Sequence, residues 1–131
     1  EVTNMSFTTF LENEVLDHVF RNVAYTPPAT VYIGLYTSAT GAGGTGTEVS
    51  GNGYTRKAMA FDASVSGAID NTAAVEFPTA TGSWGTVTHT AVLDAATGGN
   101  MLAETALTAS KPIGDGDVFR FQAGEFDITL T

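Results

Sequence analysis

The sequence predicts a mainly β protein, an antiparallel β-sandwich of about seven strands with one N-terminal α-helix. Three observations lead to this prediction. Residues 11–20 repeat apolar side chains at a helical period, residues 30–36 change to a period of two, and short apolar segments then recur between turn-forming residues. We expect one domain over residues 1–131, comprising a lead (1–9), a helix (10–22) and the β-sandwich (30–131).

The helix is predicted from its boundaries and from one apolar face. Thr9 and Glu12 have the spacing of a capping box, in which each side chain pairs with a backbone N–H of the first turn. Asn22 and the approach to Pro27 and Pro28 predict its end, because proline disfavours a helical conformation in its predecessor. The face that we expect to be buried comprises Leu11, Val15, Leu16, Val19 and Phe20.

The strands are predicted from alternation and from turn residues. Residues 31–36 are apolar on both faces, so we expect this strand to be covered on both sides. Residues 38–53 are rich in Gly, Ser and Thr and predict a long exposed loop. Further strands are expected at residues 54–61, 73–77, 86–93, 101–107, 118–122 and 125–130. The last of these has Phe126, Ile128 and Leu130 on one face, which predicts that all three are buried.

The composition argues against several classes of function. A net charge of −9 would repel a nucleic-acid backbone. No apolar run approaches the ~18 residues of a membrane span, and we expect neither a membrane partner nor a signal peptide. The absence of cysteine excludes disulfides and thiol catalysis. Only 15% of the residues are charged, which favours a surface that packs against other protein.

The residues that would suggest chemistry have simpler structural interpretations. His18 and His89 have no third ligand at metal spacing, so we expect partly buried rings with one hydrogen bond each. The Gly-Asp-Gly-Asp segment at residues 114–117 predicts a turn, because the glutamate that ends a calcium-binding loop is missing. The glycines of residues 41–53 include no phosphate-binding lysine. We therefore expect no catalytic residue, no metal and no cofactor, and we expect Arg56 and Lys57 to pair with acidic neighbours.

Several longer segments carry a family resemblance. They are LENEVLDHVFRN (11–22), TPPATVYIGLYT (26–37), EVSGNGYTR (48–56), FPTATGSWGTVTHTAVLDA (77–95), GGNMLAE (98–104) and QAGEFDITL (122–130). In this order they resemble small bacteriophage virion proteins usually labelled phage tail fibre proteins. The resemblance covers nearly the whole chain. It implies a structural protein located in the virion, whose partners are other virion subunits, either the major capsid protein or tail proteins.

Placement within the particle has two interpretations. A fibre shaft needs a repeated unit, and the chain contains neither an internal repeat nor a coiled-coil heptad. Our first interpretation is therefore a homo-oligomeric protein that decorates and cements the capsid. The alternative is a tail-fibre or tail-tip module that binds host-surface glycan, with Trp84 or the tyrosines Tyr32, Tyr36 and Tyr54 stacking on sugar rings. A hydrolytic enzyme with His89 as base is a weaker third hypothesis.

Two segments are predicted to contact partners. Residues 5–9 and the loop of residues 41–53 are a terminus and a glycine-rich loop, which often become ordered when a neighbour packs on them. Trp84 is an interaction candidate if it is exposed, although its position at a strand entrance also suits a cap on the core. The candidate interaction residues are Met5, Ser6, Phe7, Gly43, Gly44, Glu48 and Trp84.

Overall fold

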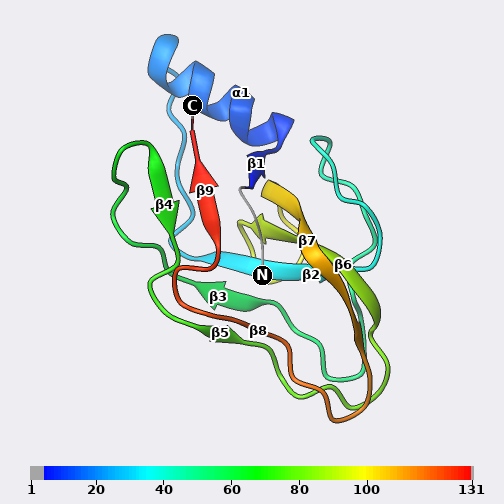
Figure 1. Ribbon diagram of the computed structural model, residues 1–131. Helices are drawn as coiled ribbons and strands as arrows, with labels where there is room; N and C mark the ends of the chain where they lie inside the picture. Colours follow the sequence, from blue (N-terminus) through cyan, green and yellow to red (C-terminus); the bar gives the residue numbers. More distant parts are fainter. Residues whose placement is uncertain (1–4, 131) are drawn as a thin grey trace.

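A five-stranded antiparallel sheet is the largest element of the computed structural model, which describes residues 5–130. The strand order is β1-β7-β6-β2-β3 (Figure 1). The strands are β1 (Ser6–Phe7), β7 (Met101–Ile113), β6 (Gly85–Leu93), β2 (Val31–Tyr36) and β3 (Lys57–Met59). β2 lies inside the sheet between β6 and β3, and its residues 33–36 are buried, which confirms the expectation from its two apolar faces.

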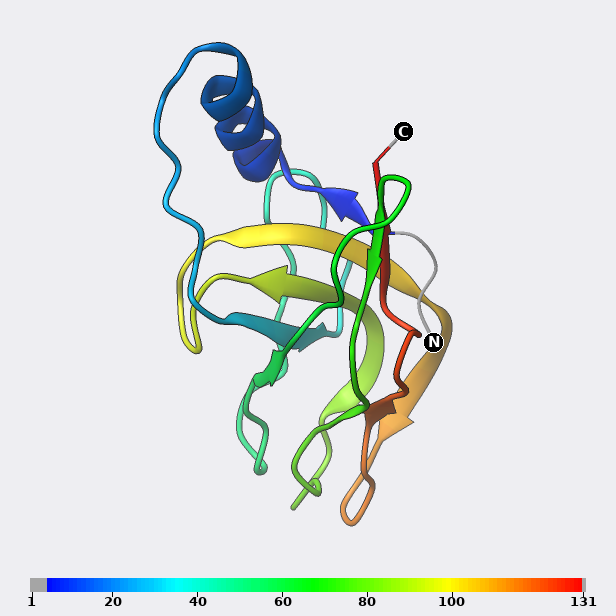
Figure 2. The same ribbon diagram turned by 90° about the vertical axis from the view of Figure 1, so that its left-hand side faces the viewer.

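Two short antiparallel sheets complete a sandwich-like arrangement (Figure 2). One pairs β4 (Ala68–Asp70) with β9 (Asp127–Thr129), and the other pairs β5 (Val75–Glu76) with β8 (Arg120–Phe121). The core includes aliphatic side chains of the large sheet and a phenylalanine cluster from the segments around the small sheets. Phe121 is central to this cluster, with ring centroids 5.1 Å from both Phe119 and Phe126. The mainly β prediction is confirmed.

The strand boundaries differ from the prediction in both directions. Nine strands are present in residues 5–130, compared with the predicted seven. The two additional strands, β1 and β4, are too short to show an alternating pattern in the sequence. β7 extends to Ile113, well beyond the predicted residue 107, since its second half pairs with the start of β6. Leu130 is exposed, contrary to the prediction, because β9 ends one residue earlier.

The helix α1 (Thr9–Phe20) begins and ends by recognisable capping. Its N-cap is Thr8, whose hydroxyl accepts a hydrogen bond from the N–H of Leu11, so the predicted capping box at Thr9 is not the cap. Asn22 adopts a positive φ of 58°, and the N–H of Val23 donates to the carbonyl of Asp17. A left-handed residue therefore ends the helix before the prolines act.

The apolar face of α1 is not buried, which corrects the prediction. The helix contacts chiefly β7 and β1 through its first half, and no residue within it is fully buried. Its last turn stands away from the sheets in both views (Figures 1 and 2). Within the described part of the chain, no helical segment combines the length and hydrophobicity that crossing a bilayer requires.

Candidate functional site

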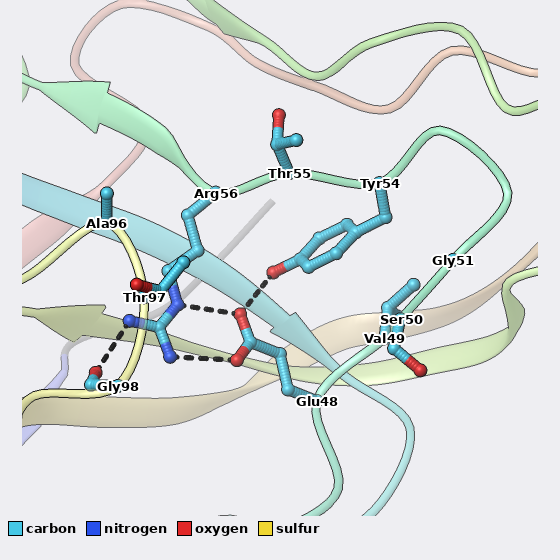
Figure 3. Close-up of a pocket in the computed structure, with 10 residues that line it drawn as sticks. All are labelled: Glu48, Val49, Ser50, Gly51, Tyr54, Thr55, Arg56, Ala96, Thr97 and Gly98. Atoms are coloured by element: carbon cyan, nitrogen blue, oxygen red, sulfur yellow. Dashed lines mark hydrogen bonds and ion pairs between the residues drawn. The ribbon is translucent and has the colours of Figure 1, made fainter.

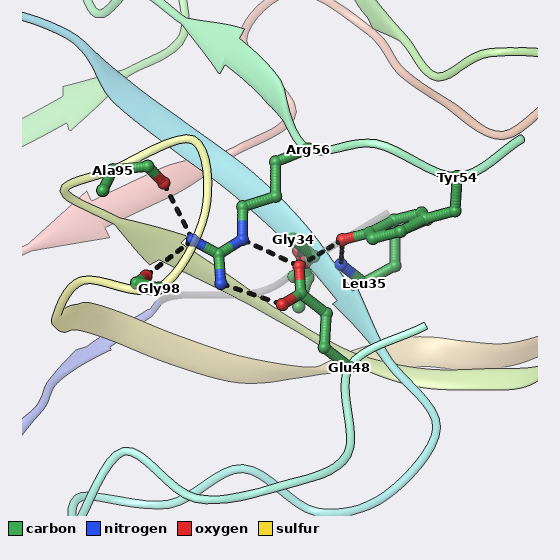
Figure 4. Close-up of polar contacts among 8 residues, drawn as sticks. Gly34, Leu35, Glu48, Tyr54, Arg56, Ala95 and Gly98 are labelled. Atoms are coloured by element: carbon green, nitrogen blue, oxygen red, sulfur yellow. Dashed lines mark hydrogen bonds and ion pairs between the residues drawn. The ribbon is translucent and has the colours of Figure 1, made fainter. Parts of the chain in front are cut away.

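A polar cluster of Glu48, Tyr54 and Arg56 lies beside the strand β2. The returning end of the 38–53 loop brings Glu48 opposite Tyr36, and the neighbouring N–H of Val49 donates to the carbonyl of Leu35 over 2.9 Å. Tyr54 and Arg56 belong to the segment that leads into β3 (Figure 4). Backbone pairing with β2 therefore places an acidic and a basic side chain next to each other.

Arg56 joins this cluster to a second loop. Its Nε and Nη2 donate to the two carboxylate oxygens of Glu48, each over 2.8 Å, in a bidentate ion pair. Its Nη1 donates to the carbonyl oxygens of Ala95 and Gly98, again over 2.8 Å. The hydrogen bonds to Glu48 raise the pKa of Arg56 further. The prediction that Arg56 pairs with an acidic neighbour is confirmed, and the pairing ties the β6–β7 turn to the β2–β3 connection.

Tyr54 completes the cluster from the core side. Its hydroxyl donates to Glu48 Oε2 over 2.6 Å and accepts a hydrogen bond from the N–H of Leu35 over 3.0 Å. Its ring stacks on Phe77 and meets Trp84 edge-on at a centroid distance of 5.4 Å. Burial, followed by the hydrogen bond to Glu48, raises the pKa of Tyr54 well above its usual value. The phenol is therefore a neutral donor across the physiological range.

Gly34 provides the space that the carboxylate occupies. A Cβ atom at this position would lie 2.9 Å from Glu48 Oε2 and 3.1 Å from a methyl carbon of Leu93. The same side of β2 carries Tyr36, whose pKa is raised to about 12, chiefly by burial and also by the charge of Glu48. A glycine at the centre of a strand usually weakens it, so its use here marks a close approach of a neighbouring group.

The cluster is satisfied internally and functions as a cross-link. It borders a groove of about 400 Å³ that is also lined by Ser50, Thr55 and Thr97 (Figure 3). A guanidinium has five N–H donors, and four hydrogen bonds of Arg56 already go to protein acceptors. Few donors remain to hold an anionic ligand. Among residues 5–130, no group of three or more His, Asp or Glu side chains is placed to hold a metal ion.

The predicted interaction residues have different surroundings. Met5 is buried where it bridges Ile128, Phe7 is half-buried in β1, and only Ser6 is exposed, so residues 5–7 are part of the fold. Residues 1–4 of the expected lead lie outside the described residues. Gly43 and Gly44 are exposed in the 38–53 loop. The two predicted contact segments meet each other, since the N–H of Thr9 donates to the carbonyl of residue 42 over 2.8 Å.

None of the four aromatic candidates is fully exposed: Trp84 and Tyr36 are buried, and Tyr32 and Tyr54 are half-buried. Trp84 is only 4% exposed and its Nε1 donates to the carbonyl of Asn52 over 2.8 Å, as expected for a residue that caps the core. Tyr36 is also buried, and Tyr54 is held in the polar cluster. Glu48, another candidate contact, is occupied by Arg56. Trp84 and Tyr36 therefore offer no free surface to a sugar ring, and the polar atoms of Tyr54 and Glu48 are already hydrogen-bonded within the cluster.

The histidines and the acidic turn have structural roles. His89 lies in β6 with its Nδ1 2.8 Å from the hydroxyl of Thr88. His18 is exposed, in contrast to the expectation of partial burial, and its Nδ1 lies 3.1 Å from the carbonyl of Val23 beyond the helix end. The segment 114–117 is a turn between β7 and β8, in which the carboxylate of Asp117 accepts a hydrogen bond from the N–H of Gly114.

One exposed surface is absent from the predicted set of contact residues. Large apolar side chains are exposed on the second half of α1, just after its end, and directly after β9. We call this surface the α1 apolar surface, and its residues are Leu16, Val19, Phe20, Val23 and Leu130. The helical period of Leu16, Val19 and Phe20 is visible in the sequence, where it predicts a face that is buried within the domain.

The fold and site define a small structural domain, with an internally satisfied polar cluster and one exposed apolar surface. A sequence model of the family described as podophage GP4 fiber I protein gp80 matches residues 6–129, and the chain belongs to this family. It is therefore a fibre-related structural protein of a bacteriophage, located in the virion. The resemblance to phage tail fibre proteins is confirmed. A search of curated proteins found no match.

Proposed function

We propose that this chain is a module of a phage tail fibre that acts through contacts with other virion proteins and has no enzymatic activity. The observation that carries the proposal is the α1 apolar surface, because a stable domain rarely exposes several large apolar side chains together unless a partner covers them. The description of the family as a fibre protein favours the tail over the capsid shell. Capsid decoration, our first interpretation of the sequence, has no comparable support.

The arrangement of the domain suits a compact fibre module. The polar cluster holds the loops around β2 through hydrogen bonds and an ion pair. A rigid domain loses little conformational entropy when it joins an assembly, so more of the contact energy is available for association. The glycan alternative is less favoured, because two of its four candidate rings, Trp84 and Tyr36, are buried and the other two, Tyr32 and Tyr54, are only partly exposed.

The experiment that tests this proposal is localisation in purified particles. A peptide tag at the end of the chain, labelled with gold and viewed by electron microscopy, should mark the tail fibres. Quantitative mass spectrometry should give a copy number far below that of the major capsid protein. Label distributed over the capsid shell, with a copy number close to that of the shell protein, would overturn the proposal and restore capsid decoration.

A further inference from the structure

The α1 apolar surface has the spacing of a helix-pairing seam. Val19 and Phe20 follow Leu16 by three and four residues, which places these three side chains along one stripe of α1. They are well exposed, with Leu16 at 54%, Val19 at 62% and Phe20 at 78%. Val23 lies beyond the end of the helix, where its N–H donates to the carbonyl of Asp17, and it adds another exposed apolar side chain next to the last turn.

A groove adjoins this stripe. It has a volume of about 680 Å³ and lies between the first half of α1 and the strands β1 and β9. Its apolar lining includes Phe7, Val15, Leu16 and Leu130. Leu16 therefore belongs to both the stripe and the groove. Phe20, the most exposed side chain of the stripe, lies one helical turn further along, about 6 Å away along the helix axis.

We propose that the α1 apolar surface is a homodimer interface. Two copies pair along α1 in antiparallel orientation about a two-fold axis, and Phe20 of each copy enters the groove of the other. A two-fold interface requires a surface that is complementary to itself. The combination of a protruding ring and a hollow, offset by one helical turn, meets that requirement. Antiparallel pairing also sets the dipoles of the two helices in opposition, which is favourable.

The area is sufficient for a stable dimer. The five side chains of the α1 apolar surface leave roughly 500 Å² of apolar surface in contact with water. A standard interface buries about 800 Å² per partner, and in homodimers about two thirds of this area is apolar. The apolar area required is therefore close to what this surface supplies, and polar neighbours such as Glu12 and Asn13 can form the rim.

Charge gives the dimer a distinctive salt dependence. Each copy carries a net charge of −9, so two copies repel each other at long range. Salt screens this repulsion and leaves the apolar contact intact, so added sodium chloride should strengthen the dimer. A basic partner protein docked on the same surface would show the opposite dependence, because salt would screen an attraction.

Sedimentation of the purified protein over a wide concentration range, at low and high salt, tests the proposal. The mass should saturate at that of two chains. Phe20→Glu should raise the dimer dissociation constant at least about 30-fold, because it removes a buried ring and introduces a charge. Val118→Glu is the matched control, since Val118 is an exposed apolar residue of the β7–β8 connection. This connecting segment lies away from α1 (Figure 1). Val118→Glu should leave the dissociation constant unchanged, and circular dichroism should show that both variants fold.

Single cysteines provide a second readout, because the chain has none. Val19 lies between Leu16 and Phe20 near the proposed axis, so Val19→Cys should form a disulfide-linked dimer under mild oxidation. Val118→Cys should not form one. A monomeric wild type at every concentration, equal effects of Phe20→Glu and Val118→Glu, or growth without saturation would overturn the homodimer. A monomer in both salts would assign the surface to a different virion subunit.

This inference rests on the proposed function in treating the chain as an assembly module, but the two can fail separately. A monomeric protein that localises to the fibre refutes the homodimer alone. A dimer whose label covers the capsid shell refutes the fibre placement alone.

Discussion

The polar cluster should contribute several kilocalories per mole to the free energy of unfolding. Glu48→Gln tests this contribution, because glutamine has nearly the same shape as glutamate. The amide oxygen can replace Oε2, which accepts from Arg56 Nε and from the hydroxyl of Tyr54. The amide nitrogen then takes the place of Oε1, which accepts a hydrogen bond from Arg56 Nη2 in the wild type, and it cannot accept that bond. One charge-assisted hydrogen bond is lost, at about 1.5–3 kcal/mol, and the guanidinium loses its counter-charge.

The degree of burial sets the expected size. The side chains of Arg56 and Glu48 are 9% and 24% exposed, so water can partly compensate the unpaired cation. We therefore expect Glu48→Gln to lower the free energy of unfolding by about 2–3 kcal/mol, below the ~3–5 kcal/mol of a fully buried pair. Arg56→Met should cost more, about 3–5 kcal/mol, because it also removes the donors to the carbonyls of Ala95 and Gly98.

Urea unfolding followed by the fluorescence of Trp84 measures these effects. Trp84 is the single tryptophan, it is buried, and its ring contacts Tyr54 within the cluster. The double variant should be more stable than the sum of the single losses implies, with a coupling of about 2 kcal/mol. Glu76→Gln is the matched control, because its ion pair with Arg120 is exposed and 3.6 Å long. It should cost less than about 0.5 kcal/mol.

The result that would refute this reasoning is specific. If Glu48→Gln unfolds within about 0.5 kcal/mol of the wild type, the ion pair contributes no more than an exposed one. Additive losses in the double variant would show that the two side chains act independently. In either case the cluster would not be the cross-link that holds the loops around β2.

The remaining predictions concern single positions. Gly34→Ala should destabilise the protein by about 1–3 kcal/mol, because its Cβ would approach the cluster carboxylate too closely. Gly43→Ala is the control and should leave stability unchanged in urea unfolding, because its Cβ would meet only Thr45 Cγ2, at 3.9 Å. Thr8→Ala should cost about 1–2 kcal/mol by removing the N-cap of α1; an equal loss for exposed Thr9→Ala would contradict that assignment. Because the pKa of Tyr54 is raised in the folded state, its proton stabilises the fold fully below pH ~10 and this contribution falls as the pH rises further. Above pH ~10, Tyr54→Phe should therefore reduce the slope of the free energy of unfolding against pH by about 1.4 kcal/mol per pH unit. An unchanged slope would show that Tyr54 is not the titrating group.

The sequence predicts the elements whose pattern is long enough to be read. β2 and β6 contain six and nine residues, which is long enough to show a pattern, and their predicted bounds agree with the structure to within a residue or two. β1 and β4 contain two and three residues, so they have no period to detect, and they form because longer segments bring them beside β7 and β9. Local pattern therefore predicts long strands, and tertiary pairing decides the short ones.

The polar cluster could be predicted only in part. Glu48 and Arg56 flank a glycine-rich turn, which is suitable for an ion pair across a hairpin. The sequence also predicts that Arg56 pairs with an acidic neighbour. Gly34 provides space for the carboxylate, and the carbonyls of Ala95 and Gly98 accept hydrogen bonds from Arg56. These residues lie in other segments of the chain, well separated in sequence from Glu48 and Arg56. No short-range pattern records these contacts, because they depend on the order of the strands in the large sheet.

The exposed face of α1 shows what an amphipathic pattern does and does not specify. Its period correctly indicates that one side of the helix is apolar, and burial of that side is favourable in water. The pattern does not say whether the covering surface belongs to the same chain. Here the core is already filled by the sheets and the phenylalanine cluster, and α1 contributes only its first half to the packing. We propose that another copy or another virion protein buries the remaining apolar stripe, so the same helical pattern that predicts an internal contact also suits an assembly contact.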